Sequence, residues 1–400
     1  MTAPLQLPPP LMTSEPGSFA RATIVERKPK IIAQVIADNA YPPEIVHALD
    51  DFTSELASGV IQPLNEAAPD VGLWNDTLAA AHAGKTWLEV PWYFAETYFY
   101  RRLLEAVRYL QPGPWQGRNP FQRQKRELME ADVRRLAGEW DQVAGLEPSA
   151  KFEVLLHSCL WGNRTDLSNY TVTRRGPGVA ARDERHLILI DHTAEVEARL
   201  SMGAAQVDFI NDNVGMDLLF DLALADFLLR QGWVRAVTFH LKDRPFFVSD
   251  AMPDDALVTL SLLKASDHPA LKQLGGKLAD HEAAGRLVFA TDPFWTTCLM
   301  YRQMPSQVRA RLACSGLVIL KGDVNYRRLL DDAHWPYTTR MEDVVGYFPA
   351  PFVTLRTLKG EIMVGLQTGQ AEALTEEDPT WLLNGKHGVI QLVDLARTGC

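Results

Sequence analysis

Residues 207–230 read VDFINDNVGMDLLFDLALADFLLR. The first four residues predict the end of a buried strand, and Gly215 permits a tight turn into the apolar helix that follows. Asp212 and Asn213 then come at the carboxyl end of the strand. A buried strand that leads at once into a helix is typical of parallel sheets, so this stretch predicts an α/β fold.

Short apolar runs of the same kind recur from about residue 148 onward, separated by turn residues and helix-like stretches. They are HLILIDH, VRAVTFHL, PFFVSDA, GRLVFATDPF, SGLVILKGDVNYRRLL, FVTLRTLKG and EIMVGL. Their alternation with helices predicts a mostly parallel, Rossmann-like sheet covered by helices on both faces. We therefore expect a three-layer α/β/α sandwich over residues 148–400, although the pattern after about residue 370 assigns no element.

The preceding part of the chain shows helical periodicity. In AETYFYRRLLEAVRYL and RELMEADVRRLAGEW, apolar residues recur at three- and four-residue spacing with charges between them. Prolines and glycines in YPPE, QPGPWQGRNP and GLEPS mark helix connections. This pattern predicts an all-helical N-terminal domain over residues 20–147. Residues 1–19 are proline-interrupted and have no basic segment, which predicts a disordered leader and not a secretory signal.

Composition limits the classes of partner. The 400 residues are 46% apolar and 22% charged, as in globular proteins. The formal charge of −10 disfavours nucleic acid and anionic membrane surfaces, and no apolar run reaches the roughly 18 residues that span a bilayer. Four cysteines without CxxC spacing suggest incidental thiols in a reducing compartment. We expect a cytoplasmic protein, and the oligomeric state stays open.

Several known catalytic motifs are absent. The sequence contains no GxxxxGK[ST] loop, GxGxxG fingerprint, GxSxG elbow or HExxH helix. P-loop ATP hydrolysis, ordinary dinucleotide binding, serine esterase chemistry and zincin proteolysis therefore lose their main support.

Acidic and amide side chains come at two predicted strand ends. Asp212 and Asn213 follow one apolar run, and Asp250 ends another, FFVSD. Ligand sites of open α/β sheets lie outside the carboxyl ends of the strands, so we expect these residues to converge. Their oxygens suit a hard divalent cation such as Mg²⁺ or Mn²⁺. Taken singly, each residue is explained as well by capping of the next helix.

The helical part of the opening stretch carries three more acids, Asp217, Asp221 and Asp226. Asp217 lies in the first helical turn, where the helix dipole favours a negative charge. Asp217 and Asp221 are four residues apart and share one face of the helix. For Asp221 and Asp226 we expect a solvated edge of an otherwise buried helix.

Two later runs combine cationic and polar residues. In LVILKGDVNYRRLL, Arg327 offers a planar fork for phosphate oxygens, and Asp323 and Asn325 can hydrogen-bond hydroxyls. A solvated start of a helix is the plain alternative. In FVTLRTLKGEIMVGL, Arg356 and Lys359 lie between apolar runs, where a lysine either reaches solvent or binds phosphate.

A resemblance to a known family rests on six stretches in order, LEVPWYFAETYFYRRLLEA, LLHSCLWGNRTDLSN, NDNVGMDLLFDLALADFLL, FHLKDRPFFVSD, LKGDVNYRRLL and FVTLRTLKGEIMVGL. From about residue 88 to residue 366 the chain resembles the metal-dependent damage-control phosphatases of the domain-of-unknown-function-89 family, most closely the RTxK-motif subfamily. The resemblance implies a helical N-terminal region packed on an α/β/α core. It also implies Mn²⁺-, Co²⁺- or Ni²⁺-dependent hydrolysis of sugar phosphates such as fructose 1-phosphate and fructose 6-phosphate.

The resemblance also implies roles for single residues. The implied metal ligands are Asp212, Asn213 and Asp250. The implied substrate-binding residues are Asp323, Asn325, Tyr326 and Arg327 of the KGDxNYR motif, and Arg356 and Lys359 of the RTxK motif, with the lysine on phosphate. Asn163 and Asp166 of the LWGNxxDLS motif are implied as pocket-wall residues. Asp217 stands where the subfamily usually has glutamate, which implies a substrate-facing acid with a shorter reach.

We therefore expect a metal-dependent phosphatase that hydrolyses phosphomonoesters of sugar phosphates or related damaged metabolites, with Mn²⁺, or Co²⁺, Ni²⁺ or Mg²⁺, as cofactor. Asp212 and Asp250 are the expected catalytic residues, and the nucleophile is either a water held at the metal or one of these carboxylates. One alternative is an S-adenosylmethionine-dependent protein carboxyl (glutamate) methyltransferase, an activity attached by name to a relative in this subfamily. Another is a non-catalytic binding protein that keeps the fold.

Overall fold

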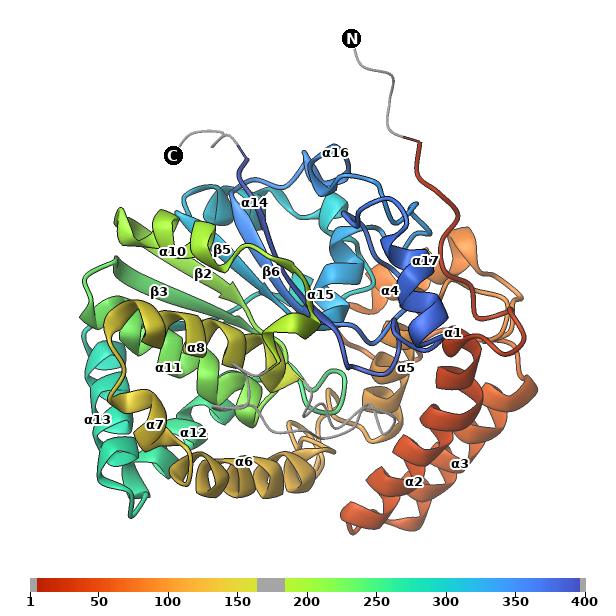
Figure 1. Cartoon of the computed structure of the whole chain (residues 1–400). Helices are drawn as coiled ribbons and strands as arrows, with labels where there is room; N and C mark the ends of the chain where they lie inside the picture. The colour runs from red at the N-terminus through yellow and green to blue at the C-terminus, as the bar shows by residue number, and fades with distance from the viewer. Residues whose placement is uncertain (1–5, 164–183, 396–400) are drawn as a thin grey trace.

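The computed structural model describes residues 6–163 and 184–395, and in them a seven-stranded sheet forms the centre of the molecule (Figure 1). The strand order is β1-β7-β6-β5-β2-β3-β4. The strands are β1 (Ile188–Asp191), β2 (Ala204–Ile210), β3 (Val234–Leu241), β4 (Leu287–Thr291), β5 (Leu317–Lys321), β6 (Phe352–Thr357) and β7 (Gly388–Val393). Strands β2 to β6 run parallel to one another, and β7 lies antiparallel to β6. The predicted mostly parallel sheet is confirmed.

Two hydrophobic cores lie on opposite faces of the sheet. Along β2, Phe209 packs in one core and Ile210 in the other, and Ile319 and Leu320 alternate in the same way along β5. This alternation explains why β5 is apolar from Leu317 to Leu320, since both of its faces are buried. The first core is covered by α8 (Pro148–Gly162), α11 (Met216–Arg230), α12 (Pro253–Ala265) and α13 (Pro269–Ala283). The second is covered by α14 (Ser306–Ala313), α15 (Gly322–Leu329) and α16 (Met341–Val345). The three layers of the predicted sandwich are therefore present.

The chain order places a switch point between β2 and β5. From β2 the chain proceeds outward through β3 and β4, and it then returns to β5 and β6 on the other side of β2. Loops that leave β2 and β5 must therefore diverge, and they leave a crevice outside the carboxyl ends of these strands. Residues after Ile210 and Lys321 face this crevice.

The N-terminal part is helical, as expected, and packs beside the sheet (Figure 1). Its elements are α1 (Phe19–Ala22), a π-helical turn η1 (Thr23–Arg27), α2 (Lys28–Asp38), α3 (Pro43–Ser58), α4 (Val71–Ala81), α5 (Trp92–Ala106), α6 (Gln122–Ala137) and α7 (Trp140–Ala144). A third core forms among α2 to α5 and includes Phe246, Phe247 and Val248 from the loop after β3. The N-terminal helices thus contact a loop at the carboxyl edge of the sheet.

Two details differ from the predicted organisation of the N-terminal part. Residues 128–143 of α6 and α7 share the core of α8 and α11, so the hydrophobic packing changes partner well before residue 147. The expected leader is packed from Pro10 onward: Leu11 is fully buried, and its backbone bonds Asp332 and Trp92. Apolar residues between prolines supply this contact, which composition alone does not reveal.

Some short elements also differ from expectation. FFVSDA is a loop with left-handed φ angles at Phe247 and Val248, and residues 361–366 form no strand. The tail, which the sequence pattern leaves unassigned, contains α17 (Gln370–Glu377) and β7, and β1 is followed by α10 (Thr193–Ser201). Cys159 and Cys298 are free thiols, but Cys314 is disulfide-bonded, so the expectation of incidental thiols is wrong for Cys314. Within the described ranges, no helix combines the length and the apolar character needed to cross a membrane.

Candidate active site

A small pocket opens where the loops after β2, β3, β5 and β6 meet the N-terminal helices. Its volume is about 30 Å³. It is lined by Arg27, Trp92, Glu96, Asp212, Asn213, Phe247, Asp250, Asp323, Val324 and Lys359. This is the crevice at the switch point of the sheet, where ligands of open α/β folds bind.

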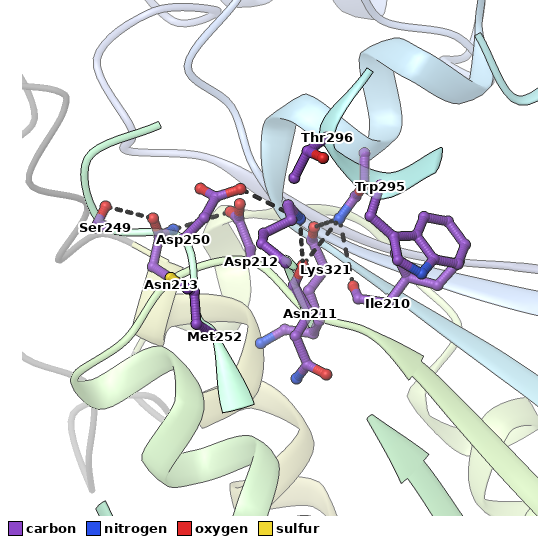
Figure 2. Close-up of polar contacts among 12 residues, drawn as sticks. Ile210, Asn211, Asp212, Asn213, Ser249, Asp250, Met252, Trp295, Thr296 and Lys321 are labelled. Carbon is purple, nitrogen blue, oxygen red and sulfur yellow. Dashed lines mark hydrogen bonds and ion pairs between the residues drawn. The ribbon is translucent and has the colours of Figure 1, made fainter. Parts of the chain in front are cut away.

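Backbone hydrogen bonds draw the loops after β2 and β3 together. Asn213 and Asp250 form an antiparallel bridge. Val214 N donates to Ser249 O at 2.8 Å, and Ala251 N donates to Asp212 O at 2.8 Å. As a result Asp212, Asn213 and Asp250 lie side by side although they come from different strands (Figure 2). The convergence that we expected from the strand ends is therefore observed.

The Asp212 carboxylate is held in one orientation. Its Oδ2 accepts hydrogen bonds from Asn163 Nδ2 at 2.5 Å and from Asn213 Nδ2 at 2.9 Å. Gly322, at φ +84°, passes so close that a Cβ there would lie 1.9 Å from Asp212 Oδ2. Only glycine permits this close approach of the β5 turn to the carboxylate.

Asp250 follows a strained loop that other residues hold in place. Phe247 and Val248 have φ angles of 46° and 52°, a region that bulky side chains rarely adopt. Lys125 Nζ from α6 donates to Asp250 O at 2.7 Å, and Lys242 Nζ lies 3.2 Å from Asp250 Oδ2. The packing of this loop overcomes its local strain and presents the carboxylate to the pocket.

A buried ion-pair cluster lies behind Asp212. Lys321 Nζ donates to Asp217 Oδ1 at 2.5 Å, to Asp221 Oδ1 at 2.6 Å and to Cys159 O at 2.7 Å. Burial raises the pKa of Asp221 to about 6, although Lys321 opposes the shift. Asn163 Nδ2 connects this cluster to Asp212, since it also donates to Asp217 Oδ2 at 2.9 Å.

The expectation for two of the three acids of α11 needs correction, and the substrate-facing role of Asp217 stays a prediction. Asp217 is fully buried and does not line the pocket, so its position gives no support to a substrate-facing role. Asp221 and Asp226 are also buried, at 1% and 3% exposure, so the expectation of a solvated edge is wrong for both. Asp226 pairs with Arg230 at 2.8 Å and lies 3.5 Å from His281. Helical periodicity does not show which acids have a buried cationic partner elsewhere in the chain.

The two arginines of the KGDxNYR and RTxK motifs hold Asp323 and the loop after β6. Arg356 Nε donates to Asp323 Oδ1 at 2.7 Å, and its other nitrogens donate to Gly360 O and Ile362 O. Arg327 Nε donates to Asp332 Oδ1 at 2.7 Å, and its guanidinium lies 3.6 Å from the centre of the Trp92 ring. Burial alone would raise the pKa of Asp323, but Arg356, Arg327 and Lys359 hold it below its usual value.

The predicted substrate residues thus fall into two groups. Asp323 and Lys359 line the pocket, and Lys359 Nζ donates to Asn163 O at 2.8 Å. The others do not line it: Asn163, Asn325, Tyr326, Arg327 and Arg356. The Asn325 amide bonds Tyr301 and the backbone at the end of β2, and Tyr326 lies beneath Arg356. Their roles as direct substrate ligands stay predictions, while their contacts show that they support the loops of the site. Asp166 lies outside the described residues.

Sequence reasoning did not identify the N-terminal side of the pocket. Arg27 comes from η1, and Trp92 and Glu96 come from α5. A signal was present, because Glu96 is an acid inside the run WYFAETYFY, where periodicity predicts burial. Lys242, which pairs with Asp250, was likewise detectable as a cation directly after the apolar end of β3.

The residues of the pocket fit a hard divalent cation. Across the described residues, no three His, Cys, Asp or Glu side chains are grouped to hold a metal ion. Asp212, Asp250 and Asn213 instead offer two carboxylates and one carboxamide, with exposures of 5%, 2% and 3%. Asn213 Oδ1 accepts from Ser249 Oγ at 2.6 Å and keeps a second lone pair. Mg²⁺ and Mn²⁺ commonly complete so small a donor set with water and substrate oxygens.

Known proteins resemble this chain along almost its whole length. Residues 23–374 match the family model described as the damage-control phosphatase ARMT1-like domain. The chain is 31% identical to damage-control phosphatase ARMT1 of Danio rerio over 98% of both chains. It is 30% identical to the Homo sapiens protein of the same name over 96% of this chain and 98% of that protein. A solved DUF89 family protein from Pyrococcus horikoshii covers 93% of this chain and 97% of its own, at 14% identity and a TM-score of 0.49.

Proposed function

The chain belongs to the damage-control phosphatase ARMT1-like family, as its motifs predicted, and from this membership we propose that it is a metal-dependent phosphatase acting on sugar phosphates or related damaged metabolites. Fructose 1-phosphate and fructose 6-phosphate are the substrates to test first. Mn²⁺ is the proposed cofactor, with Co²⁺, Ni²⁺ or Mg²⁺ as alternatives.

The observation that supports this proposal most directly is the set of charges that lines the pocket. Four carboxylates line it, from Glu96, Asp212, Asp250 and Asp323, together with two cationic side chains, Arg27 and Lys359. Glu96, Asp250 and Asp323 have cationic partners in Lys28, Lys242 and Arg356, which do not line the pocket, so a phosphate ester still meets more acidic than cationic side chains there and binds better if a further cation is present. A divalent ion at Asp212, Asn213 and Asp250 would be that cation, and Lys359 adds a positive charge beside it.

When bound, such an ion acts as a Lewis acid that withdraws charge from a phosphoryl oxygen. Asp212 and Asp250 would hold it, and Asn163 and Asn213 keep the Asp212 carboxylate oriented through hydrogen bonds to Oδ2. This preorganisation lowers the cost of binding, because the carboxylate does not need to reorient.

Lys359 is the residue best placed to neutralise the transferring phosphoryl group. It lines the pocket, and the carbonyl of Asn163 anchors its ammonium. Arg356 shapes the loop that carries it, and Thr357 Oγ1 ties that loop to Leu160 O of α8 at 3.0 Å. The RTxK motif thus combines two residues that hold the loop with one that contributes charge to the pocket.

The pocket also restricts solvent. Trp92 and Phe247 contribute aromatic walls, and about 30 Å³ is room for only a few water molecules. A phosphorylated sugar therefore requires the surrounding side chains to move apart on binding. Once it is bound, exclusion of water strengthens the electrostatic contacts of Lys359 with the phosphoryl group.

Phosphate release tests the proposal. Fructose 1-phosphate and fructose 6-phosphate are incubated with the protein and Mn²⁺, and release should stop when EDTA is added. Asp250→Asn should lower turnover at least about 100-fold, since it removes a charged ligand. Asp254→Asn, an exposed aspartate four residues along the chain, is the matched control and should keep full activity.

Two outcomes would contradict the proposal. One is equal phosphate release by the Asp250→Asn variant and the unmodified protein. The other is methylation of protein carboxyl groups from S-adenosylmethionine without any phosphate release, which would establish the alternative activity.

A further inference from the structure

Glu96 is an acidic residue inside the most aromatic helix of the N-terminal region. Helix α5 contributes Trp92, Phe94, Tyr98 and Phe99 to buried clusters, and Glu96 lies among them at 0% exposure. The same side chain lines the pocket together with Asp212, Asp250 and Lys359. A buried carboxylate in such surroundings is costly unless it has a partner or a function.

One oxygen of Glu96 is fixed by cations. Lys28 Nζ donates to Glu96 Oε1 at 2.5 Å, and Arg27 Nη2 lies 3.8 Å from the same oxygen. Lys28 is itself fully buried, with its ammonium 4.5 and 4.4 Å from the ring centres of Phe99 and Tyr100. The start of α2 thereby sets the orientation of a side chain on α5.

The other oxygen has no such contact. Glu96 Oε2 is buried and, among the described residues, has no hydrogen-bond donor. A buried acceptor that has lost its water and found no donor destabilises the protein. Because Glu96 lines the pocket, a donor on a bound ligand is the natural partner of this oxygen.

We propose that Glu96 Oε2 accepts a hydrogen bond from a hydroxyl of the substrate's organic part, so that the N-terminal helical region selects polyhydroxylated phosphate esters. This inference rests on the proposed phosphatase function and names a residue that selects for the hydroxyl groups of its substrates. The phosphoryl group is not the partner, since Glu96 would repel it while Lys359 attracts it. An ester that carries a carboxylate in place of the hydroxyl is disfavoured for the same reason.

Metal binding by Glu96 is a separate possibility that its contacts argue against. Lys28 and Arg27 already occupy the Oε1 side of the carboxylate. An ion would have to compete with two fixed positive charges, whereas a neutral hydroxyl donates to Oε2 without such repulsion. Glu96 therefore acts in selecting the substrate and not in holding the ion.

Glu96→Gln is the sharpest variant, because the amide oxygen can still accept from Lys28 while an NH₂ donor replaces Oε2. The kcat/KM values are measured with Mn²⁺ for fructose 1-phosphate and for para-nitrophenyl phosphate, which has no sugar hydroxyls. The value for the sugar phosphate should fall about 10- to 100-fold, and the value for the aryl phosphate should stay within about threefold. Glu26→Gln, an exposed position in η1, is the control and should change neither value.

An equal loss with both esters would overturn the inference, because it would indicate a purely structural role. Unchanged kcat/KM values would overturn the inference too. So would a direct Mn²⁺ titration in which Glu96→Gln loses as much metal affinity as Asp250→Asn. If Glu96→Gln does not fold, Glu96→Asp withdraws the oxygen by one methylene and should give the same selective loss, and an equal loss again overturns the inference.

Failure of the proposed function gives a distinct result. In that case the unmodified protein releases phosphate from neither ester, and calorimetric titration of fructose 1-phosphate with Mn²⁺ present becomes the deciding measurement. Binding weakened about 10-fold or more in Glu96→Gln keeps Glu96 as a hydroxyl-binding residue. Indistinguishable titrations of the two proteins overturn it.

Discussion

At the scale of single residues, the Lys321 cluster makes stability depend on pH. Burial raises the pKa of Asp221 from 3.8 to about 6 in the folded protein. Between these two pH values the folded state keeps a proton on Asp221 that the unfolded state has lost. Protonation of Asp221 therefore stabilises the folded protein in acid. This stabilisation is lost as the pH rises through about 6. We therefore compare the free energies of unfolding of the unmodified protein and of Asp221→Asn. The value for the unmodified protein minus the value for the variant should fall by about 1 to 3 kcal/mol between pH 4 and pH 7. Denaturant unfolding at several pH values measures it.

The same experiment has a clear contrary result. A difference between the two proteins that is flat from pH 4 to pH 7, or that rises with pH, would show that Asp221 is not a buried carboxyl with a raised pKa. The substitution retains one oxygen that can accept from Lys321 but removes the one that accepts from Asn211. That second loss does not vary with pH, so the pH dependence of the difference reports the charge of Asp221.

At the scale of elements, the turn from β5 into α15 decides whether Asp212 keeps its place. Gly322→Ala would put a Cβ 1.9 Å from Asp212 Oδ2 at a φ of +84°. The carboxylate would have to move, so Mn²⁺-dependent turnover should fall at least about 100-fold. The left-handed φ alone should cost about 1–2 kcal/mol of stability.

A matched glycine separates these two effects. Gly232 has a φ of +70°, and nothing lies within 4 Å of the Cβ that alanine would add. Gly232→Ala should show the loss of stability without the loss of turnover, as measured by thermal unfolding and phosphate release. Equal turnover by Gly322→Ala and Gly232→Ala would show that the close contact of Gly322 with the Asp212 carboxylate is not needed for activity.

At the scale of the whole molecule, the N-terminal segment ties the helical region to the sheet. Leu11 N donates to Asp332 O, and Trp92 N donates to Leu11 O, so one residue links the loop after α15 to the start of α5. Leu11→Ala should lower the free energy of unfolding by about 2–5 kcal/mol, because it leaves a cavity at this junction. Leu7→Ala, at a residue that is 45% exposed, should change it by less than about 0.5 kcal/mol. Chemical denaturation compares them, and equal effects would contradict the packed role of Leu11.

Much of the fold was predictable from local patterns. Six of the strands coincide with mainly apolar runs flanked by turn residues, because both faces of the central strands are buried. Strand β7 was not assigned, since it follows an acidic tail and pairs antiparallel with β6. The residues FFV before Asp250 predict a strand, but this stretch is a loop, because Phe247 and Val248 adopt left-handed φ angles.

The sequence by itself determined the layered α/β architecture and the position of Asp212 and Asn213 at the carboxyl edge, since these follow from periodicity and from where an apolar run ends. Its motifs determined the family. Only the tertiary structure decided which charges meet. Lys321 is 100 residues from Asp221, and Lys28 is 68 residues from Glu96. Local patterns report burial, whereas the partner of a buried charge depends on the order of strands in the sheet and on the helices packed against its edge.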